Sequence, residues 1–209
     1  MLLSRTLRFL LPTLLFALPS AASAQVPRYG LGVQIGALFH HPDLEPSALA
    51  TPFAGLEASL VLPQGGGRLR PLVSLTRAQM ATDGEASDPR VFDGAYTWTL
   101  DEHMTLLGVG LTARPLDQKW NFQIEGRLAP QLVWTNTVTQ SASSEGDFGS
   151  STSRFFTVGL LAALGFALNT DLGEFTLTGS GTAVPVRGDL SGKGFLTGVA
   201  PTLGYRYWF

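Results

Sequence analysis

Residues 120–134 read WNFQIEGRLAPQLVW, and apolar and polar side chains alternate through this segment. The apolar side chains are those of Trp120, Phe122, Ile124, Leu128, Leu132 and Trp134. The intervening positions are mainly polar or charged and include Asn121, Gln123, Glu125, Arg127 and Gln131. Because successive side chains of a β-strand point to opposite faces, the pattern predicts a strand with one apolar and one polar face.

Seven other segments repeat this alternation. They cover residues 29–39, 54–62, 69–75, 107–113, 156–168, 175–182 and 195–209. Strands of about 9 to 15 residues are long for a soluble domain, where about 5 to 6 is usual, and suit a tilted strand that crosses a membrane.

The polar faces of these segments consist mostly of glycine, serine, threonine and amide side chains, with a few charges. Such a face fits the narrow interior of a small barrel whose apolar face contacts lipid. Lipid does not tolerate the unpaired edges of an open sheet. We therefore predict an all-β fold, a closed antiparallel eight-stranded up-and-down transmembrane β-barrel.

The connections between these segments alternate in length. Brief links at 63–68, 115–119 and 169–173 contrast with longer ones at 40–52, 80–102, 136–153 and 187–194. This asymmetry is typical of outer-membrane barrels with short periplasmic turns, longer external loops and both termini on the periplasmic side.

Two details of the sequence leave alternatives open for the strands. Tyr96 and Trp98 alternate with threonines, so a hairpin here extends two strands or raises the count to ten; Gly179, Gly181 and Pro185 allow a shortened seventh strand.

The first 24 residues have the features of a secretory signal peptide. Arg5 and Arg8 precede an apolar stretch, and Ala22, Ser23 and Ala24 offer a small-residue cleavage site. The predicted domains are therefore a signal peptide over 1–24 and a barrel over 25–209. The chain has no cysteine and a net charge of -2, so we expect no thiolate metal site, no cofactor and no nucleic-acid partner.

The chain ends in GYRYWF, residues 204–209, with Tyr205, Tyr207 and Phe209 at alternate positions. This ending resembles the C-terminal signal that the barrel-assembly machinery recognises in outer-membrane proteins. The whole pattern resembles the small eight-stranded outer-membrane barrels of the OmpA transmembrane domain and OmpX class. The resemblance implies residence in a Gram-negative outer membrane, escort by periplasmic chaperones, and contact with outer-membrane lipid and lipopolysaccharide. It implies no particular activity.

Several charged and amide side chains belong to the predicted interior. They are Gln34, Glu57, Arg70, Arg114, Glu125, Arg127 and Arg206. Eight strands leave an interior just wide enough for side chains to fill it, and unpaired charges there are costly. We expect a polar network that plugs the lumen. The alternative is a narrow or gated pore for small ions, in which removal of Arg127 increases conductance.

Enzymatic activity is not expected. None of the three histidines lies in the His-x-Ser pattern of outer-membrane deacylases and phospholipases. A weaker alternative is a lipid-modifying enzyme that uses His41 or His103 with Asp83 or Asp88 and with Ser87, as in lipid A palmitoyltransferases. The tripeptide Arg-Gly-Asp at 187–189 is one that integrins recognise, but Gly-Asp is also ordinary in turns, and we favour a chance occurrence. The sequence therefore favours a structural or surface-interaction role.

Overall fold

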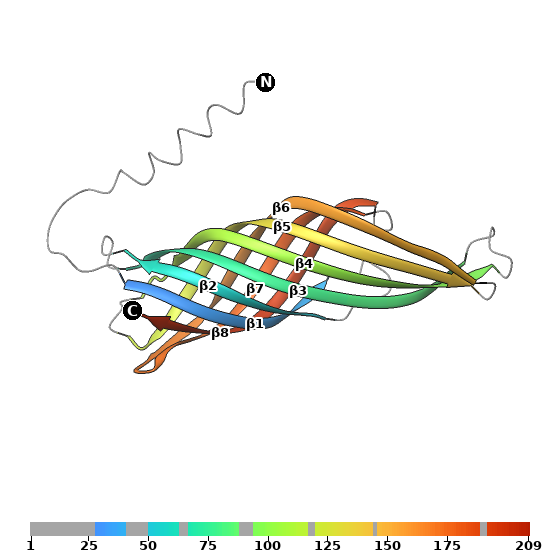
Figure 1. Ribbon diagram of the computed structural model, residues 1–209. Coiled ribbons are helices and arrows are strands. Elements are labelled where there is room, and N and C mark those ends of the chain that lie inside the picture. Colours follow the sequence, from blue (N-terminus) through green and yellow to red (C-terminus); the bar gives the residue numbers. More distant parts are fainter. Residues whose placement is uncertain are drawn as a thin grey trace, which may run out of the picture.

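The computed structural model describes residues 28–40, 50–62, 67–87, 94–116, 120–143, 146–188 and 192–209; the expected signal peptide lies outside them. The strands are β1 (Arg28–His40), β2 (Thr51–Val61), β3 (Leu69–Ser87), β4 (Ala95–Ala113), β5 (Phe122–Ser143), β6 (Gly146–Thr170), β7 (Gly173–Gly188) and β8 (Gly192–Trp208). Each strand pairs antiparallel with the next, and β8 pairs with β1 to close the ring (Figure 1). The predicted eight-stranded closed barrel is confirmed. Within the described ranges, no helix has the length and apolar character needed to cross a membrane.

The apolar face of each strand points outward. On β1, Leu31, Val33 and Ile35 are each more than half exposed, whereas Gly32 and Gln34 face the interior. An exported soluble barrel would place its apolar side chains in the interior instead. An outer surface formed by the apolar side chains of the strands is characteristic of contact with lipid.

Aromatic side chains border the apolar surface at both ends of the barrel. Phe122 stacks with Phe166 at a ring-centroid distance of 5.3 Å, and Trp134 lies 5.3 Å from Phe156 further along the same two strands. Trp134 follows Phe122 by about 12 residues, which corresponds to about 30 Å along the axis for a strand tilted by about 40°. This spacing matches the thickness of a bilayer's hydrocarbon core. We call the end with Arg28 and Phe209 the terminal end and the opposite one the distal end.

Four strands continue beyond the others at the distal end. The β2–β3 register ends at the pair Phe53 and Ala78, whereas β3 and β4 remain paired as far as Ser87 and Ala95. Strands β5 and β6 remain paired as far as Ser143 and Gly146. The resulting four-stranded extension, which we call the distal sheet, consists of residues 79–87, 95–103, 136–143 and 146–154 (Figure 1).

The distal sheet corrects the expected loop lengths. The long connection predicted over 136–153 is mainly strand, and β5 and β6 have 22 and 25 residues, above the predicted range. The hairpin around Tyr96 lengthens β3 and β4 and adds no strands, so the ten-strand alternative is wrong. Strand β7 is continuous over Gly173–Gly188 despite its glycines. The alternation at Tyr96 and Trp98 indicated the β3–β4 extension, whereas the β5–β6 extension was missed because hydrogen bonds between neighbouring strands form without apolar alternation.

Candidate functional site

The charged residues of the interior are brought together by strand register near the terminal end. Glu57 on β2 lies opposite Gly32 on β1, and Gly32 in turn lies opposite Arg206 on β8. Arg206 also lies opposite Glu174 on β7. Because Gly32 has no side chain, the guanidinium of Arg206 reaches the carboxylates of both neighbours, Glu57 and Glu174.

The ion pairs form a closed loop, which we call the charge circuit. Its members, in order of contact, are Glu57, Arg127, Glu125, Arg114, Glu174 and Arg206. The Nη1 atom of Arg127 lies 2.6 Å from Glu57, and its Nη2 atom lies 2.6 Å from Glu125. Arg114 likewise lies 2.6 Å from both Glu125 and Glu174. Each member thus has two partners of opposite charge, supplied by strands β2, β5, β7 and β8 and by the residue that follows β4.

Arg70 and Trp208 extend the charge circuit toward the terminal end. The Nη1 atom of Arg70 lies 3.3 Å from Glu174, and its Nε donates to the backbone carbonyl of Gly67. The ring of Trp208 lies 4.9 Å from the Arg70 guanidinium carbon and 5.3 Å from that of Arg206. A Cβ at Gly30 would lie 2.6 Å from this ring, so glycine makes room for it. Trp208 therefore contributes cation–π contacts to both arginines.

The charge circuit is removed from solvent. Glu125 and Glu174 are fully buried, and Arg114 is 1% exposed. Small residues on β6 leave space for the long side chains of β5, since Gly165 lies opposite Glu125 and Ala163 lies opposite Arg127. Charges in such surroundings are tolerated only when they are paired and hydrogen-bonded, as they are here.

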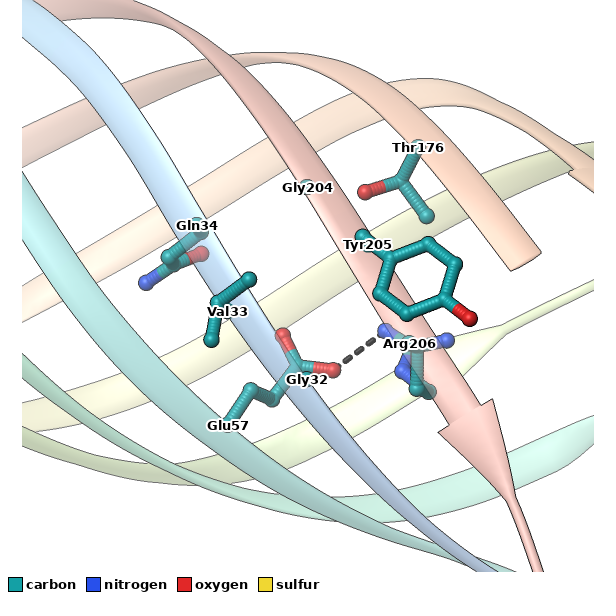
Figure 2. A pocket seen from close by; sticks show the side chains of 8 residues that line it. All are labelled: Gly32, Val33, Gln34, Glu57, Thr176, Gly204, Tyr205 and Arg206. Carbon is teal, nitrogen blue, oxygen red and sulfur yellow. Dashed lines mark hydrogen bonds and ion pairs between the residues drawn. The ribbon is translucent and has the colours of Figure 1, made fainter. Parts of the chain in front are cut away.

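Little empty space remains beside the ion pairs. A cavity of about 10 Å³ is lined by residues that include Gly32, Gln34, Glu57 and Arg206 (Figure 2). A cavity of this size holds about one water molecule. Side chains therefore leave room for little more than one water molecule at this place in the lumen.

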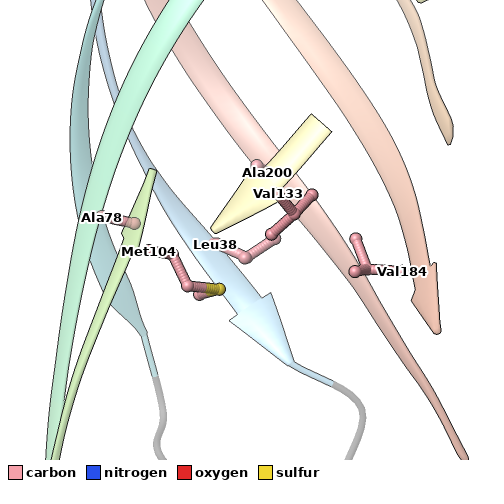
Figure 3. Packing of buried hydrophobic residues seen from close by; sticks show 6 residues of the cluster. All are labelled: Leu38, Ala78, Met104, Val133, Val184 and Ala200. Carbon is pink, nitrogen blue, oxygen red and sulfur yellow. The ribbon is translucent and has the colours of Figure 1, made fainter. Parts of the chain in front are cut away.

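An apolar layer lies beyond the charge circuit, toward the distal end. It consists of Leu38, Ala78, Met104, Val133, Val184 and Ala200, whose side chains converge from six strands (Figure 3). Each of the six is less than 8% exposed, and Phe53 and Leu106 pack against them. The interior is therefore filled at two levels, one ionic and one apolar.

The structure brings together all but one of the interior residues named from the sequence. The exception, Gln34, donates a hydrogen bond of 3.0 Å to the Thr76 hydroxyl and takes no part in the ion pairs. Glu174, in contrast, was missed although it contacts three arginines. It was overlooked because it directly follows the turn glycine Gly173. Glu174, Thr176 and Thr178 occupy alternate positions, so they share the polar face of this strand. This spacing could have placed Glu174 in the interior.

The terminal aromatic residues lie on the outer surface. Tyr207 and Phe209 are largely exposed and pack edge-to-face at 5.0 Å. Tyr205 lies 5.1 Å from Phe175, and its hydroxyl donates to the backbone carbonyl of Leu172. All three side chains face away from the lumen, so they are available to lipid or to another protein.

The described residues give little support to the catalytic alternative. His103 lies 3.8 Å from Asp101 on the distal sheet. Ser87 lies opposite Ala95, which is eight residues from His103 along β4, or about 26 Å. His41 and Asp88 lie outside the described ranges, as does Asp189 of the Arg-Gly-Asp tripeptide. Over those same ranges, no three side chains form a cluster able to hold a metal ion.

No protein-family model matches the chain, and no curated protein matches it either. Solved structures resemble it over nearly their whole length, including the following two. Neisserial surface protein A is 12% identical with a TM-score of 0.55, over 87% of this chain and 97% of that one. A major outer membrane protein from Thermus thermophilus is 13% identical with a TM-score of 0.53, over 87% of this chain and 99% of that one. At such identities the likeness shows the fold alone, and the fold is that of the small eight-stranded outer-membrane β-barrels.

Proposed function

We propose that this protein is a non-conducting barrel of a Gram-negative outer membrane that holds the distal sheet at the cell surface. In this arrangement the signal peptide directs export, the terminal end faces the periplasm, and the distal sheet projects outward. The main observation in support is that two layers of side chains, the charge circuit and the apolar layer, fill the lumen. A barrel closed at two levels suits a role in anchoring and display.

The pore alternative requires a continuous wet path. The cavity beside Glu57 and Arg206 holds about one water molecule, and buried apolar side chains pack together at the next level of the interior. An ion would therefore have to displace two sets of packed side chains. The separation of His103 from Ser87 disfavours a catalytic site built from these two residues.

The remaining partners follow from the membrane setting. Lipopolysaccharide would surround the distal half of the apolar surface. The alternate aromatics Tyr205, Tyr207 and Phe209 would be read by the barrel-assembly machinery after periplasmic chaperones deliver the chain. The exposure of Tyr207 and Phe209 on the outer surface supports this interpretation.

Reconstitution of residues 25–209 into lipid vesicles tests the proposal. We expect altered gel mobility before boiling, high sheet content, and single-channel conductance at the baseline of empty bilayers. A sheet-rich protein that does not insert into lipid would refute the membrane assignment. Steady conductance would refute the non-conducting role and favour the ion-pore alternative.

A matched pair of substitutions tests the membrane assignment independently. Leu160 is half exposed on the outer surface between the aromatic borders, whereas Thr152 lies on the distal sheet. Leu160→Arg should lower the free energy of unfolding in lipid by about 2 to 4 kcal/mol, since arginine on the lipid face near the midplane is costly. Thr152→Arg should leave this free energy nearly unchanged. Equal effects of the two substitutions would contradict a membrane-embedded surface.

A further inference from the structure

The outer surface is interrupted by a groove near the terminal end of β3, β4, β5 and β6. Four residues form a row across these strands, in the order Leu69, Ala113, Gly126 and Leu164. The two central residues are small and the two flanking ones are large, so the row is hollowed at its centre. The hollow has a volume of about 370 Å³.

The walls of the groove are almost wholly apolar. Ile124 and Pro115 add to the apolar lining contributed by the row. Leu164 is 74% exposed and Leu69 is 54% exposed, so both walls are accessible from outside the barrel. An apolar hollow in a lipid-facing surface is filled by whatever apolar chain the membrane supplies. The chemistry of the walls therefore matches an acyl chain.

A positive charge lies beside the groove. Arg68, which directly precedes β3, contributes to its lining and is exposed. The backbone carbonyl of Arg68 accepts a hydrogen bond of 2.8 Å from the backbone N–H of Arg114, which fixes the residue at this position. No carboxylate within the described ranges pairs with its guanidinium. Arg114 also borders the groove, but its own guanidinium is engaged in the charge circuit.

The depth of the groove suits one class of lipid. Ile124 follows Phe122, which belongs to the aromatic border at the terminal end, so the groove begins where headgroups meet acyl chains. A ligand placed here has an acyl chain against the apolar walls and an anionic group at Arg68. Guanidinium groups bind phosphate oxygens through charge-assisted hydrogen bonds.

We propose that this groove binds one anionic glycerophospholipid of the periplasmic leaflet, with one acyl chain along Gly126 and its phosphate at Arg68. The inference rests on the proposed membrane location and deepens it, because it names one lipid class and one site. A zwitterionic lipid of the same chain length would fill the apolar groove but bring an ammonium group close to the guanidinium. The site should therefore prefer the lipid of net negative charge.

Native mass spectrometry of the refolded barrel tests the proposal. The sample is released from detergent micelles that contain equal amounts of phosphatidylglycerol and phosphatidylethanolamine with identical acyl chains. We expect one retained lipid per barrel, with at least a fivefold preference for phosphatidylglycerol. Arg68→Gln should reduce this preference to near unity, because it removes the charge and leaves the walls intact.

Two further variants separate the parts of the site. Gly126→Leu should reduce retention of both lipids severalfold by filling the groove. A Cβ here would lie 3.6 Å from Leu164, which is an ordinary contact, and the rest of the side chain would extend into the groove. Arg28→Gln is the matched control, since Arg28 is an exposed arginine at the same end of the barrel. It should leave both the preference and the amount of bound lipid unchanged.

The outcomes distinguish this inference from the proposed function. Wild-type protein without a preference, or equal losses in Arg68→Gln and Arg28→Gln, would overturn the lipid site. If such a sample still shows heat-modifiable mobility in vesicles, the membrane barrel stands and only the site fails. Failure to insert into vesicles at all would overturn both.

Discussion

Arg114 donates two hydrogen bonds to Glu174, of 2.6 and 2.7 Å, although 60 positions separate the two residues in the chain. Arg114 follows β4 and Glu174 lies on β7, so the pair spans the lumen. Bidentate pairing of this kind fixes orientation as well as distance. Arg114 also contacts Glu125, and the resulting charge circuit connects strands that share no backbone hydrogen bonds.

Loss of the Glu174 charge should destabilise the barrel. Glu174→Gln leaves Arg70, Arg114 and Arg206 close together without their shared carboxylate. Removal of one partner from a buried ion pair typically costs about 3 to 5 kcal/mol. We expect a loss of that size in the free energy of unfolding by urea in lipid. The control is Glu85→Gln on the distal sheet, which should change this free energy little; a Glu174→Gln variant as stable as this control would refute a stabilising circuit.

Conductance should appear only when both levels of the lumen are opened. Arg127→Ala removes an arginine from the charge circuit, and Val133→Ser places a small polar side chain in the apolar layer. Each single variant should remain near baseline in planar bilayers, because the other level still fills the interior. The double variant should conduct measurably. Conductance in Arg127→Ala alone would show that the ionic level is the only barrier.

Close approach of neighbouring strands should make Gly165 intolerant of a methyl group. A Cβ at Gly165 would lie 2.3 Å from the Leu177 carbonyl oxygen, whereas no heavy atom lies within 4 Å of a Cβ at Gly179. Gly165→Ala should cost about 1 to 3 kcal/mol of unfolding free energy through overpacking. Gly179→Ala should be neutral or slightly stabilising, since alanine restricts the unfolded chain. Urea titrations in lipid measure both, and similar losses would contradict the strand spacing.

The terminal aromatic pattern should affect assisted assembly more than unaided folding. Phe209 is 66% exposed, so Phe209→Ala removes little internal packing. We expect slower insertion into proteoliposomes that contain the barrel-assembly machinery, with unchanged refolding into vesicles that lack it. Trp120→Ala is the control, because Trp120 is an equally exposed aromatic at the same end. Equal slowing of insertion in both variants would indicate a general effect of interfacial aromatic residues and would contradict a specific C-terminal assembly signal.

The barrel itself was predictable from the sequence because lipid enforces alternation. Within the membrane every second side chain must be apolar to contact lipid. The alternation in segments such as 120–134 therefore predicts which side chains face the lipid and which face the lumen. Beyond the aromatic border both faces of a strand meet water, and the serines and threonines of 146–154 show no alternation. The β5–β6 half of the distal sheet was missed for this reason, whereas the alternation of Tyr96 and Trp98 with threonines indicated the β3–β4 half.

The charge circuit was predictable in part. The phase of each strand placed Glu57, Glu125 and Arg127 inside, and the cost of unpaired charge predicted that they pair. Which arginine meets which glutamate depends on register between strands distant in the chain, as with Arg206 and Glu57. Alternation within a single strand carries no information about that register.

The closed order of the charge circuit also limits how this sequence can change through descent. A charge reversal at Arg127 places like charges against Glu57 and Glu125 together, so a second reversal relieves only one of the two conflicts. Apolar replacement of a single member leaves two neighbours short of a partner. Related proteins are therefore expected either to retain the charged residues at all six positions or to have apolar residues at all six. Either way, the six positions should covary as one group in an alignment of relatives, and this covariation would mark the circuit without any structure.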